Sequence, residues 1–398
     1  MKHAVLLRAL GSLIALGAAA AIWFPAMHLF FRPNMDDYFA VKSGISPKAR
    51  AIAAYQLDLW KDPGKRTREV ARMRTSNAEW DFMGRTFLVL SLANMALHEP
   101  DRQEEYLKVM DRIIEETIRF ENDKGIYFFL MDYAREGKFS SDQPASIFID
   151  GETALMLGAR RMVRERTDYK PMMKQRIDRL VKMMTKGPVL CAESYPNECW
   201  MFCNTVALAT LRISDVLDGS DHSAFLKKWV AMAKTKLIDV KSGLLFSSFG
   251  LDGTPLDGPE GSSIWMVSHC LQIVDPSFAN DQYARARKEL ATTVFGFGYA
   301  KEWPACWRGS PDIDSGPIVP VLDASAGSSG LALIGASAFK DSVYLKALIT
   351  SLNFAAFPNK QNNTLRYCAS NQVGDAVILY SLVNGPLWDK VLRAKKAS

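Results

Sequence analysis

The sequence predicts an all-α protein, an (α/α)6 toroid that follows an N-terminal transmembrane or signal segment. Apolar helical segments rich in small residues alternate with charged amphipathic segments from about residue 45 onward. Links inside a pair of segments are short, whereas links between pairs are long and rich in Gly, Pro and aromatic residues. An apolar helix is buried on most sides and an amphipathic helix faces water on one side, so six such hairpins can close into a ring with the apolar helices inside. An open helical solenoid would show the same weak repeat.

The N-terminal segment has the simplest pattern. Lys2 and Arg8 give a positive end, and an apolar run follows from Ala9 to Phe31. At about 1.5 Å per residue, a helix of this length spans a bilayer. We therefore expect residues 1–35 to be an uncleaved signal anchor, or else a cleaved signal peptide, and residues 36–398 to be one exported domain facing the periplasm. A buried N-terminal helix of a cytosolic protein is the third interpretation.

The helical pairs follow in order, each with the apolar helix first. A first helix is expected near 47–60 and a last one near 371–384, which makes roughly twelve helices. The five pairs between them are 78–97 with 101–120, 145–165 with 169–184, 200–217 with 221–237, 262–274 with 281–296, and 325–339 with 342–352.

The long connections predict where a functional site lies. Residues 121–144, 185–199, 238–261 and 297–324 each lead into an apolar helix, so the N-termini of the inner helices line one mouth of the ring. Those N-termini carry free N–H groups and a partial positive charge. A cavity lined by polar groups at such a place is a default ligand site. The polar or aromatic residues at the helix starts are Glu79, Asp81, Asp150, Glu152, Cys199, Cys203, Ser263, Trp265, Asp323 and Ser325.

Composition and motifs exclude several classes of function. The chain is 48% hydrophobic and 23% charged, with a net charge of +6, which suits a folded globular protein. Its basic residues are scattered and no basic run alternates with aromatics, so we expect no nucleic-acid partner. The five histidines are not clustered, and Cys191, Cys199 and Cys203 lack zinc-ribbon spacing. No GxGxxG or GxxxxGK[ST] motif occurs, so we expect no metal and no cofactor.

Carboxyl groups and thiols are the candidate chemical groups. Asp81, Asp150, Glu152, Glu193 and Asp323 can all reach one cavity, where two carboxyls could act as general acid and base on a glycoside. Acidic residues at helix starts are also common caps, which is the structural alternative. Asp150-Gly-Glu152 is the best of these groups, since the glycine lets the backbone approach a ligand.

The cysteines allow several interpretations. Cys199 and Cys203 are four apart and would share one face of a helix start, where the helix dipole lowers a thiol pKa. A disulfide between Cys191 and Cys203 is an alternative in an exported protein. Cys270 and Cys368 are expected to be packing residues.

The stretch "CAESYPNECWMFCNTVALA", residues 191–209, carries a family resemblance. Its Cys…Pro…Cys-Asn-Thr-Val-Ala pattern, the later "LID…G" helix end and the "VDPSF" turn make residues 188–290 similar to the linalool dehydratase/isomerase family, and the likeness extends more loosely from "DDYFA" at 36–40 to the C-terminus. The resemblance implies an exported (α/α)6 barrel that assembles into rings of subunits. It also implies addition or removal of water at an allylic alcohol, with isomerisation, and without a metal.

The resemblance also implies site residues. The two pocket cysteines of the family match Cys191 and Cys203, although the spacing here is three residues longer. An aspartate near the subunit interface matches Asp58. The pocket histidine falls at Glu152, so an imidazole is replaced by a carboxyl group. The positions of two pocket tyrosines fall near Gly64 and Met83.

The sequence therefore predicts a cofactor-free lyase or isomerase for a hydrophobic hydroxylated small molecule, terpenoids included. Glu152 and Asp58 would handle protons on the hydroxyl, and Cys203 with Cys191 would handle protons at carbon. The expected binding residues are Asp81, Asp150, Tyr127, Glu193, Phe246 and Trp265, with Trp303 as a further aromatic wall.

Two other classes of function remain open. One is a carbohydrate-active hydrolase or lyase that uses Asp81, Asp150 or Glu152, with tryptophans as sugar platforms at positions 80, 200, 265 and 307. The other is a membrane-anchored binding protein without catalysis, and in either case a homo-oligomer is a candidate assembly.

Overall fold

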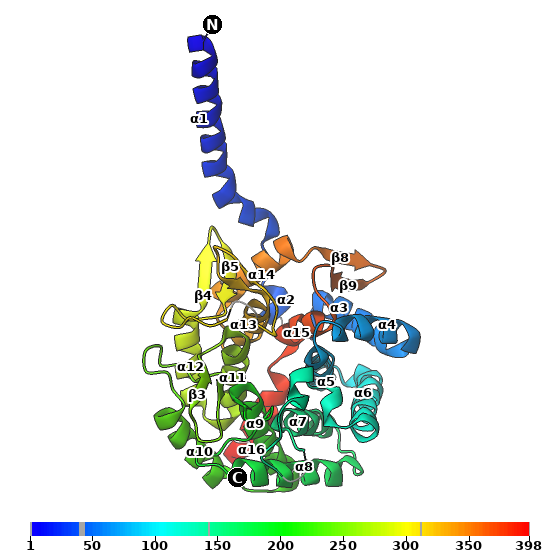
Figure 1. Ribbon diagram of the computed structural model, residues 1–398. Helices are drawn as coiled ribbons and strands as arrows, with labels where there is room; N and C mark the ends of the chain where they lie inside the picture. The colour runs from blue at the N-terminus through cyan, green and yellow to red at the C-terminus, as the bar shows by residue number, and fades with distance from the viewer. Residues whose placement is uncertain (1, 40–43, 142–143, 311–312, 398) are drawn as a thin grey trace.

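The computed structural model describes residues 2–39, 44–141, 144–310 and 313–397. Helix α1 (Lys2–Met27) stands clear of the remainder of the chain, as Figure 1 shows, and the short η1 (His28–Phe31) packs against α14 of the globular part. The helical segment from His3 to Phe31 is long and apolar enough to cross a membrane, and its most apolar stretch buries nothing against the protein. This agrees with the expectation of a membrane or signal segment, while its orientation stays a prediction.

Six helices form the inner ring. They are α5 (Ala78–His98), α7 (Ile147–Val163), α9 (Met201–Asp218), α11 (Gly261–Val274), α13 (Ala326–Ala338) and α15 (Gln372–Val383). Each packs against the next along the chain, and α15 packs back against α5. The ring is therefore closed, which confirms the (α/α)6 toroid and excludes the open solenoid. The inner helices are mostly buried because their small and apolar residues face neighbours on several sides.

The outer layer consists of amphipathic helices. They are α3 (Pro47–Lys61), α6 (Gln103–Lys124), α8 (Tyr169–Met184), α10 (Ser223–Lys236), α12 (Pro276–Glu289) and α14 (Ser342–Ala355). Several begin at side-chain caps that the sequence encodes: Ser46 accepts from the Ala49 N–H, and Asp275 accepts from the Phe278 N–H. Short links join α5, α7, α9, α11 and α13 each to the outer helix that follows, as in a helical hairpin.

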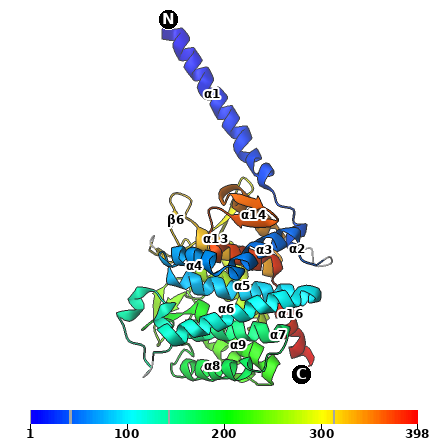
Figure 2. The ribbon, with the colours of Figure 1, turned by 90° about the vertical axis from the view of Figure 1, so that its right-hand side faces the viewer.

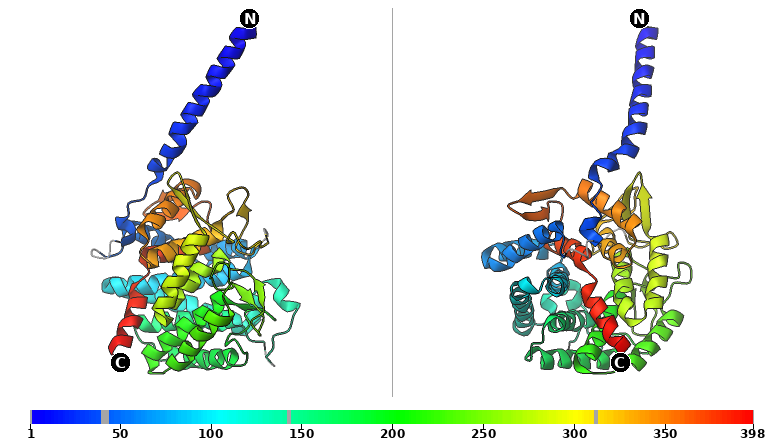
Figure 3. Two further views of the ribbon diagram at one scale, coloured as in Figure 1. Left: turned by 90° about the vertical axis from the view of Figure 1, so that its left-hand side faces the viewer. Right: turned by 180° about the vertical axis from the view of Figure 1, so that it is seen from behind.

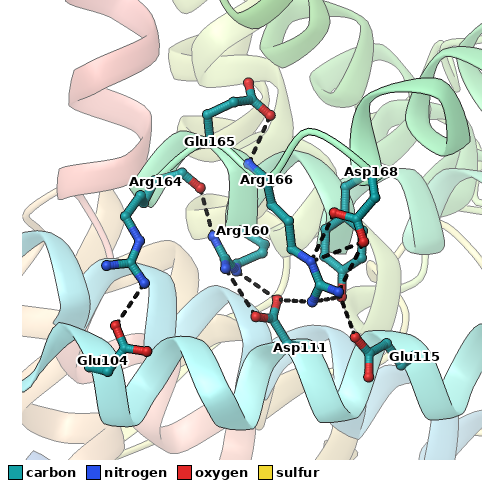
Figure 4. A network of polar contacts seen from close by, with 9 residues as sticks. Glu104, Asp111, Glu115, Arg160, Arg164, Glu165, Arg166 and Asp168 are labelled. Atoms are coloured by element: carbon teal, nitrogen blue, oxygen red, sulfur yellow. Dashed lines mark hydrogen bonds and ion pairs between the residues drawn. The ribbon is translucent and has the colours of Figure 1, made fainter.

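Ion pairs hold the two layers together. Figure 4 shows the link between α7 and α8 lying over α6, with arginines of the link facing carboxylates of α6. Arg160 contacts Asp111 in a two-point contact at 2.7 and 3.0 Å. Arg166 contacts both Asp111 and Glu115. The contact region between the inner and outer helices is called the seam below.

Three helices were not expected from the periodicity. They are α2 (Asp36–Phe39), α4 (Pro63–Arg74) and α16 (Pro386–Ala397). Helix α16 packs against α5, α9 and α11, and the Trp388 indole donates to the His269 carbonyl at 3.0 Å. Since α16 lies at the C-terminal ends of the inner helices, it covers the base of the ring. Figure 3 shows α16 from behind, in red, across the ring. The mouth is on the other side, where Figure 2 shows β6.

Short strands brace the long connections at the mouth. β1 (Cys199–Trp200), β2 (Ser248–Phe249) and β3 (Pro255–Asp257) form one antiparallel sheet in that order, with Cys199 opposite Phe249. β4 (Ala291–Val294), β5 (Phe297–Lys301), β7 (Ala324–Ser325) and β6 (Ile318–Val319) form a second sheet in that order, and β8 (Pro358–Gln361) pairs with β9 (Thr364–Tyr367). Cys199 is thus in a strand, and the expectation that it shares a helix face with Cys203 is wrong. The chain is extended there because β1 pairs with a distant strand.

The remaining short elements lie in the connections around α6. They are the 3-10 turns η2 (Pro100–Arg102), η3 (Ile126–Phe128) and η4 (Asp132–Arg135). The last two belong to the connection that leads from α6 into α7, so they help to form the rim of the mouth.

Candidate active site

Glu152 lies on the axial side of α7 and is only 3% exposed. Its carboxyl group is hydrogen-bonded by the Thr86 hydroxyl from α5, and its charge acts on the thiols of Cys203 on α9 and Cys270 on α11. Four helices of the ring therefore converge here. Burial raises the pKa of Glu152 to about 7, because desolvation disfavours the anion more than the Thr86 hydrogen bond favours it. The group is poised to gain or lose a proton near neutral pH.

Glu152 is neither a helix cap nor half of an ion pair. The first residue of α7 is Ile147, and Ser146 is its N-cap, so Glu152 lies more than one turn inside the helix rather than at its start. Two arginines that could have paired with it, Arg85 and Arg160, are engaged elsewhere. Arg85 contacts Asp81 and Glu116, and Arg160 contacts Asp111.

The Cys203 thiol is within electrostatic reach of two carboxyl groups. Glu79 and Glu152 both act on its thiol, and Ser194 hydrogen-bonds to it. Burial raises the pKa of the Cys203 thiol well above its ordinary value. The expectation that the helix dipole lowers this pKa is therefore wrong, since the effect of desolvation at this buried position is larger than that of the dipole. At neutral pH the group is a neutral thiol and a proton donor.

Glu79 stands at the start of α5, on the mouth side of Cys203. The Tyr195 hydroxyl donates to the Glu79 carboxyl group and accepts from the Met131 N–H at 2.9 Å. The Tyr133 ring stacks on Tyr195 with centroids 4.6 Å apart. Burial raises the pKa of Glu79 to about 7, partly offset by the Tyr195 hydrogen bond. Glu79, Cys203, Glu152 and Tyr195 are called the axial cluster below.

A pocket of about 420 Å³ opens beside the axial cluster. Its lining includes Trp80, the neighbour of Glu79, and Met131, whose N–H holds Tyr195. The other lining residues are Ser76, Ile313, Asp314, Gly316 and Pro317. Through Trp80 and Met131 the pocket adjoins Glu79 and Tyr195, although neither of these two residues lines it.

Further acidic groups surround the mouth. Burial raises the pKa of Glu198, Glu260 and Glu302, and the carboxylates of Asp257 and Asp314 raise the pKa of Glu198 and Glu260 further. Ser262 donates to Glu302 through both its N–H and its hydroxyl. Within the described ranges, the cysteines, histidines and carboxylates form no group of three suited to a metal ion.

Comparison with known proteins places the chain in a family. The family model for linalool dehydratase/isomerase matches residues 152–373, more than half of the sequence. The chain belongs to the linalool dehydratase/isomerase family. This confirms the family resemblance, and the match begins at Glu152 itself. A search of curated proteins finds no match. Among solved structures, the chain is similar to a GH76 alpha-mannanase of Bacteroides thetaiotaomicron, with 13% identity, a TM-score of 0.48, and coverage of 78% of this chain and 87% of the mannanase.

Three of the expected carboxyl groups lie outside the axial cluster of this family member. Asp81 pairs with Arg85 at 2.8 Å and with Arg74 at 3.2 Å. Asp150 pairs with Arg176 and Arg179 of the outer helix α8, at 2.8 and 3.1 Å. Glu193 accepts from the backbone N–H groups of Ser140 and Asn197, both at 2.8 Å, and so ties two connections together.

The two cysteines that the family resemblance pairs have different hydrogen-bond partners. The Trp229 indole of α10 donates to the Cys191 sulfur at 3.4 Å, so this thiol points toward the outer layer, and burial raises its pKa to about 12. Cys191 and Cys203 are free thiols, not a disulfide. Cys270 is fully buried in the hydrophobic core, as expected of a packing residue, and it also lies within electrostatic reach of Glu152.

The remaining expected residues are also dispersed. Asp58 is exposed on α3. The Trp265 indole donates to the Ser328 hydroxyl at 3.1 Å and its ring packs against Tyr283 and Tyr344 of the outer layer. Tyr127 is half-buried in η3 beside Phe139, and Phe246 is buried in the core. Sequence reasoning named Glu79 as a cavity residue but missed Tyr195, although its place between Cys191 and Cys199 was a signal.

Proposed function

We propose that the chain is a cofactor-free lyase or isomerase that removes, adds or relocates water on a hydrophobic hydroxylated small molecule, with allylic terpenoid alcohols as the substrate class. Membership of the linalool dehydratase/isomerase family supports the reaction class. The observation that carries the proposal is the axial cluster, in which two carboxyl groups with pKa values raised to about 7 lie within electrostatic reach of a protonated thiol.

In dehydration, Glu152 is the general acid. Its proton goes to the hydroxyl, the C–O bond breaks, and water leaves. Glu79 is the general base and takes a proton from the neighbouring carbon, so that the C–H electron pair becomes the double bond. The Tyr195 hydroxyl bond favours the anionic form of Glu79, which suits it to the base role. A pair of carboxyls held near neutral pKa can divide these tasks.

Cys203 completes the cycle in this proposal. After one turnover Glu79 holds a proton and Glu152 lacks one. Since both carboxyls act on the Cys203 thiol, the thiol can relay the proton from Glu79 back to Glu152. The same relay allows water to return at a different carbon, which is an isomerisation.

The sugar-cleaving alternative receives less support from the geometry. Two of the three carboxyls it would use, Asp81 and Asp150, are each neutralised by two arginines. Both carboxyl groups are therefore engaged within the protein.

We also propose that α1 anchors the chain with the domain facing the periplasm. An alkaline phosphatase fused after Ile45 should then be active, and an inactive fusion would reject this orientation.

The experiment compares two buried acids with the same pKa. Asp375, at the start of α15, is buried and its pKa is also raised to about 7, but it bonds to the Tyr367 N–H away from the axial cluster. On a panel of allylic terpenoid alcohols, Glu152→Gln should lower turnover about 10²- to 10⁴-fold. The matched control Asp375→Asn should stay within a few-fold of wild type.

Products would be followed as alkene and isomeric alcohol by gas chromatography. Full activity in Glu152→Gln would reject the assigned acid. A wild-type protein that converts no alcohol of the panel but cleaves a glycoside would reject the reaction class.

A further inference from the structure

The η1 segment that directly follows α1 packs against the globular part. Phe31, the last residue of the apolar span, packs against Phe297 of β5 and Phe354 of α14, with ring centroids 6.4 and 5.0 Å apart. The Asn353 side chain donates to the Phe31 carbonyl at 3.0 Å. The place where α1 ends is therefore fixed against one face of the domain, which is the upper face in Figure 1.

This same face exposes large apolar side chains. Val294 ends β4 and Phe295 begins the turn to β5, and they are 43% and 56% exposed, while Phe357, just before β8, is 65% exposed. Phe354, which contacts Phe31, is also partly exposed. Further along the same sheet, around β6, the exposed apolar residues are Val319, Val321 and Leu322. Contiguous exposed apolar side chains of this size mark an interaction surface.

The turn between β4 and β5 has an unusual backbone conformation. Phe295 has a positive φ of 48°, a conformation that bulky residues rarely adopt. Gly296 follows with a φ of 80°, and a Cβ there would clash with the His28 ring at 2.4 Å. The turn therefore holds an aromatic side chain outward directly beside the end of the apolar span. Strain at an exposed aromatic residue is a reason to look for a binding role.

We propose that this face, defined by Val294, Phe295, Phe354, Phe357 and residues 319–322, lies on the lipid bilayer that α1 enters. The bilayer is the fitting occupant because Phe31 ends the apolar span while touching the face, which leaves no length for the domain to move away. Arg32 and Lys360 are exposed nearby in the chain and suit anionic headgroups. The proposal rests on α1 being retained in the bilayer.

The consequence concerns access to the pocket. Ile313, Asp314, Gly316 and Pro317 line the pocket and directly precede β6, which belongs to the same sheet as the Phe295 turn. One connection thus joins the bilayer face to the rim of the pocket. An apolar molecule dissolved in the membrane would meet that rim without crossing bulk water.

Photo-crosslinking of the full chain in lipid vesicles tests the contact. A benzophenone amino acid would replace Phe295 or Phe357, and Met172 would be the matched control. Met172 is also apolar and exposed, at 41%, but lies on α8 at the end of the domain away from α1 (Figure 1). After irradiation in vesicles of phosphatidylcholine and phosphatidylglycerol, lipid adducts counted by mass spectrometry should be several-fold more abundant at 295 and 357 than at 172.

A third position separates this proposal from the anchor on which it rests. The same probe at Trp23, inside α1, reports whether the helix is in the bilayer. Adducts at 23 together with yields at 295 and 357 no higher than at 172 would overturn the bilayer face alone. Adducts at none of these positions would overturn the anchor as well. Crosslinks from position 295 to a second copy of the chain would overturn the proposal and show that this face is a subunit interface.

Discussion

Acidic residues on the axial side and on the seam side of one helix differ in whether an arginine pairs with them. On α7, Asp150 faces the seam and is bonded by two arginines, whereas Glu152 faces the axis, where none of the described residues supplies a cation. Residues two apart on a helix point about 200° apart. The same division occurs on α5, where Asp81 faces two arginines in the seam and Glu79 faces Tyr195 at the mouth.

The difference separates structural acids from candidate chemical acids. A carboxylate paired with arginines holds two layers together. A carboxyl group that is buried without a cation has its pKa raised toward neutral pH, and it destabilises the fold when it ionises. Nearness to a helix start does not distinguish the two kinds, because Asp81 and Glu79 share the same turn.

The largest expected change in stability comes from breaking the seam. Arg85 is 1% exposed, contacts Asp81 and Glu116 at 2.8 and 3.1 Å, and lies over the ring of Trp60. Arg85→Met removes the cation and leaves two acids with one arginine each, so the free energy of unfolding should fall by about 3–5 kcal/mol. Chemical denaturation measures this, and Glu152→Gln is the axial control without such a loss. If the Arg85→Met protein were as stable as wild type, the assignment of a structural role to the seam would be wrong.

The second prediction concerns how stability depends on pH. The pKa of Glu152 rises from 4.5 to about 7 on folding, so between these values the folded state binds more protons than the unfolded state. The stabilising contribution is then complete below about pH 4.5 and is lost as the pH rises through about 7, by about 3 kcal/mol. Glu152→Gln should remove that share of the decline, as measured by unfolding at several pH values. A decline parallel to wild type would contradict the raised pKa.

These contrasts show what the sequence could and could not provide. The ring of hairpins was readable because apolar and amphipathic helices differ in local periodicity. The strand at Cys199 was not readable, since it depends on pairing with residue 249, fifty positions away. The seam role of Asp81 had a local signal in Arg85, four residues later on the same helix. The seam role of Asp150 had no local signal in the sequence, because its partner Arg176 comes from the next helix.

The third prediction separates the two cysteines that the family resemblance treats as a pair. Cys191→Ala removes a buried sulfur and leaves the Trp229 N–H without its partner, so it should cost about 1–2 kcal/mol of stability and spare turnover. Cys203→Ala removes the proposed proton relay and should lower turnover with a smaller change in stability. Thermal unfolding and turnover of both variants would test this. Equal loss of turnover in both variants would show that Cys191 and Cys203 act together, as the family resemblance implies.

The smallest effect is expected at Asp58, the residue that the resemblance places near a subunit interface. In this chain Asp58 is exposed on the outer helix α3, apart from the axial cluster. Glu79, Cys203 and Glu152 all come from one chain, so the proposed chemistry is complete without it. Asp58→Asn should therefore change the free energy of unfolding by no more than about 0.5 kcal/mol and leave turnover unchanged. Turnover would be measured over a range of protein concentrations, beside the molar mass from light scattering. A loss of turnover that occurs only where subunits associate would show that Asp58 completes the site of a neighbouring copy, and the axial cluster would then be only part of the active site.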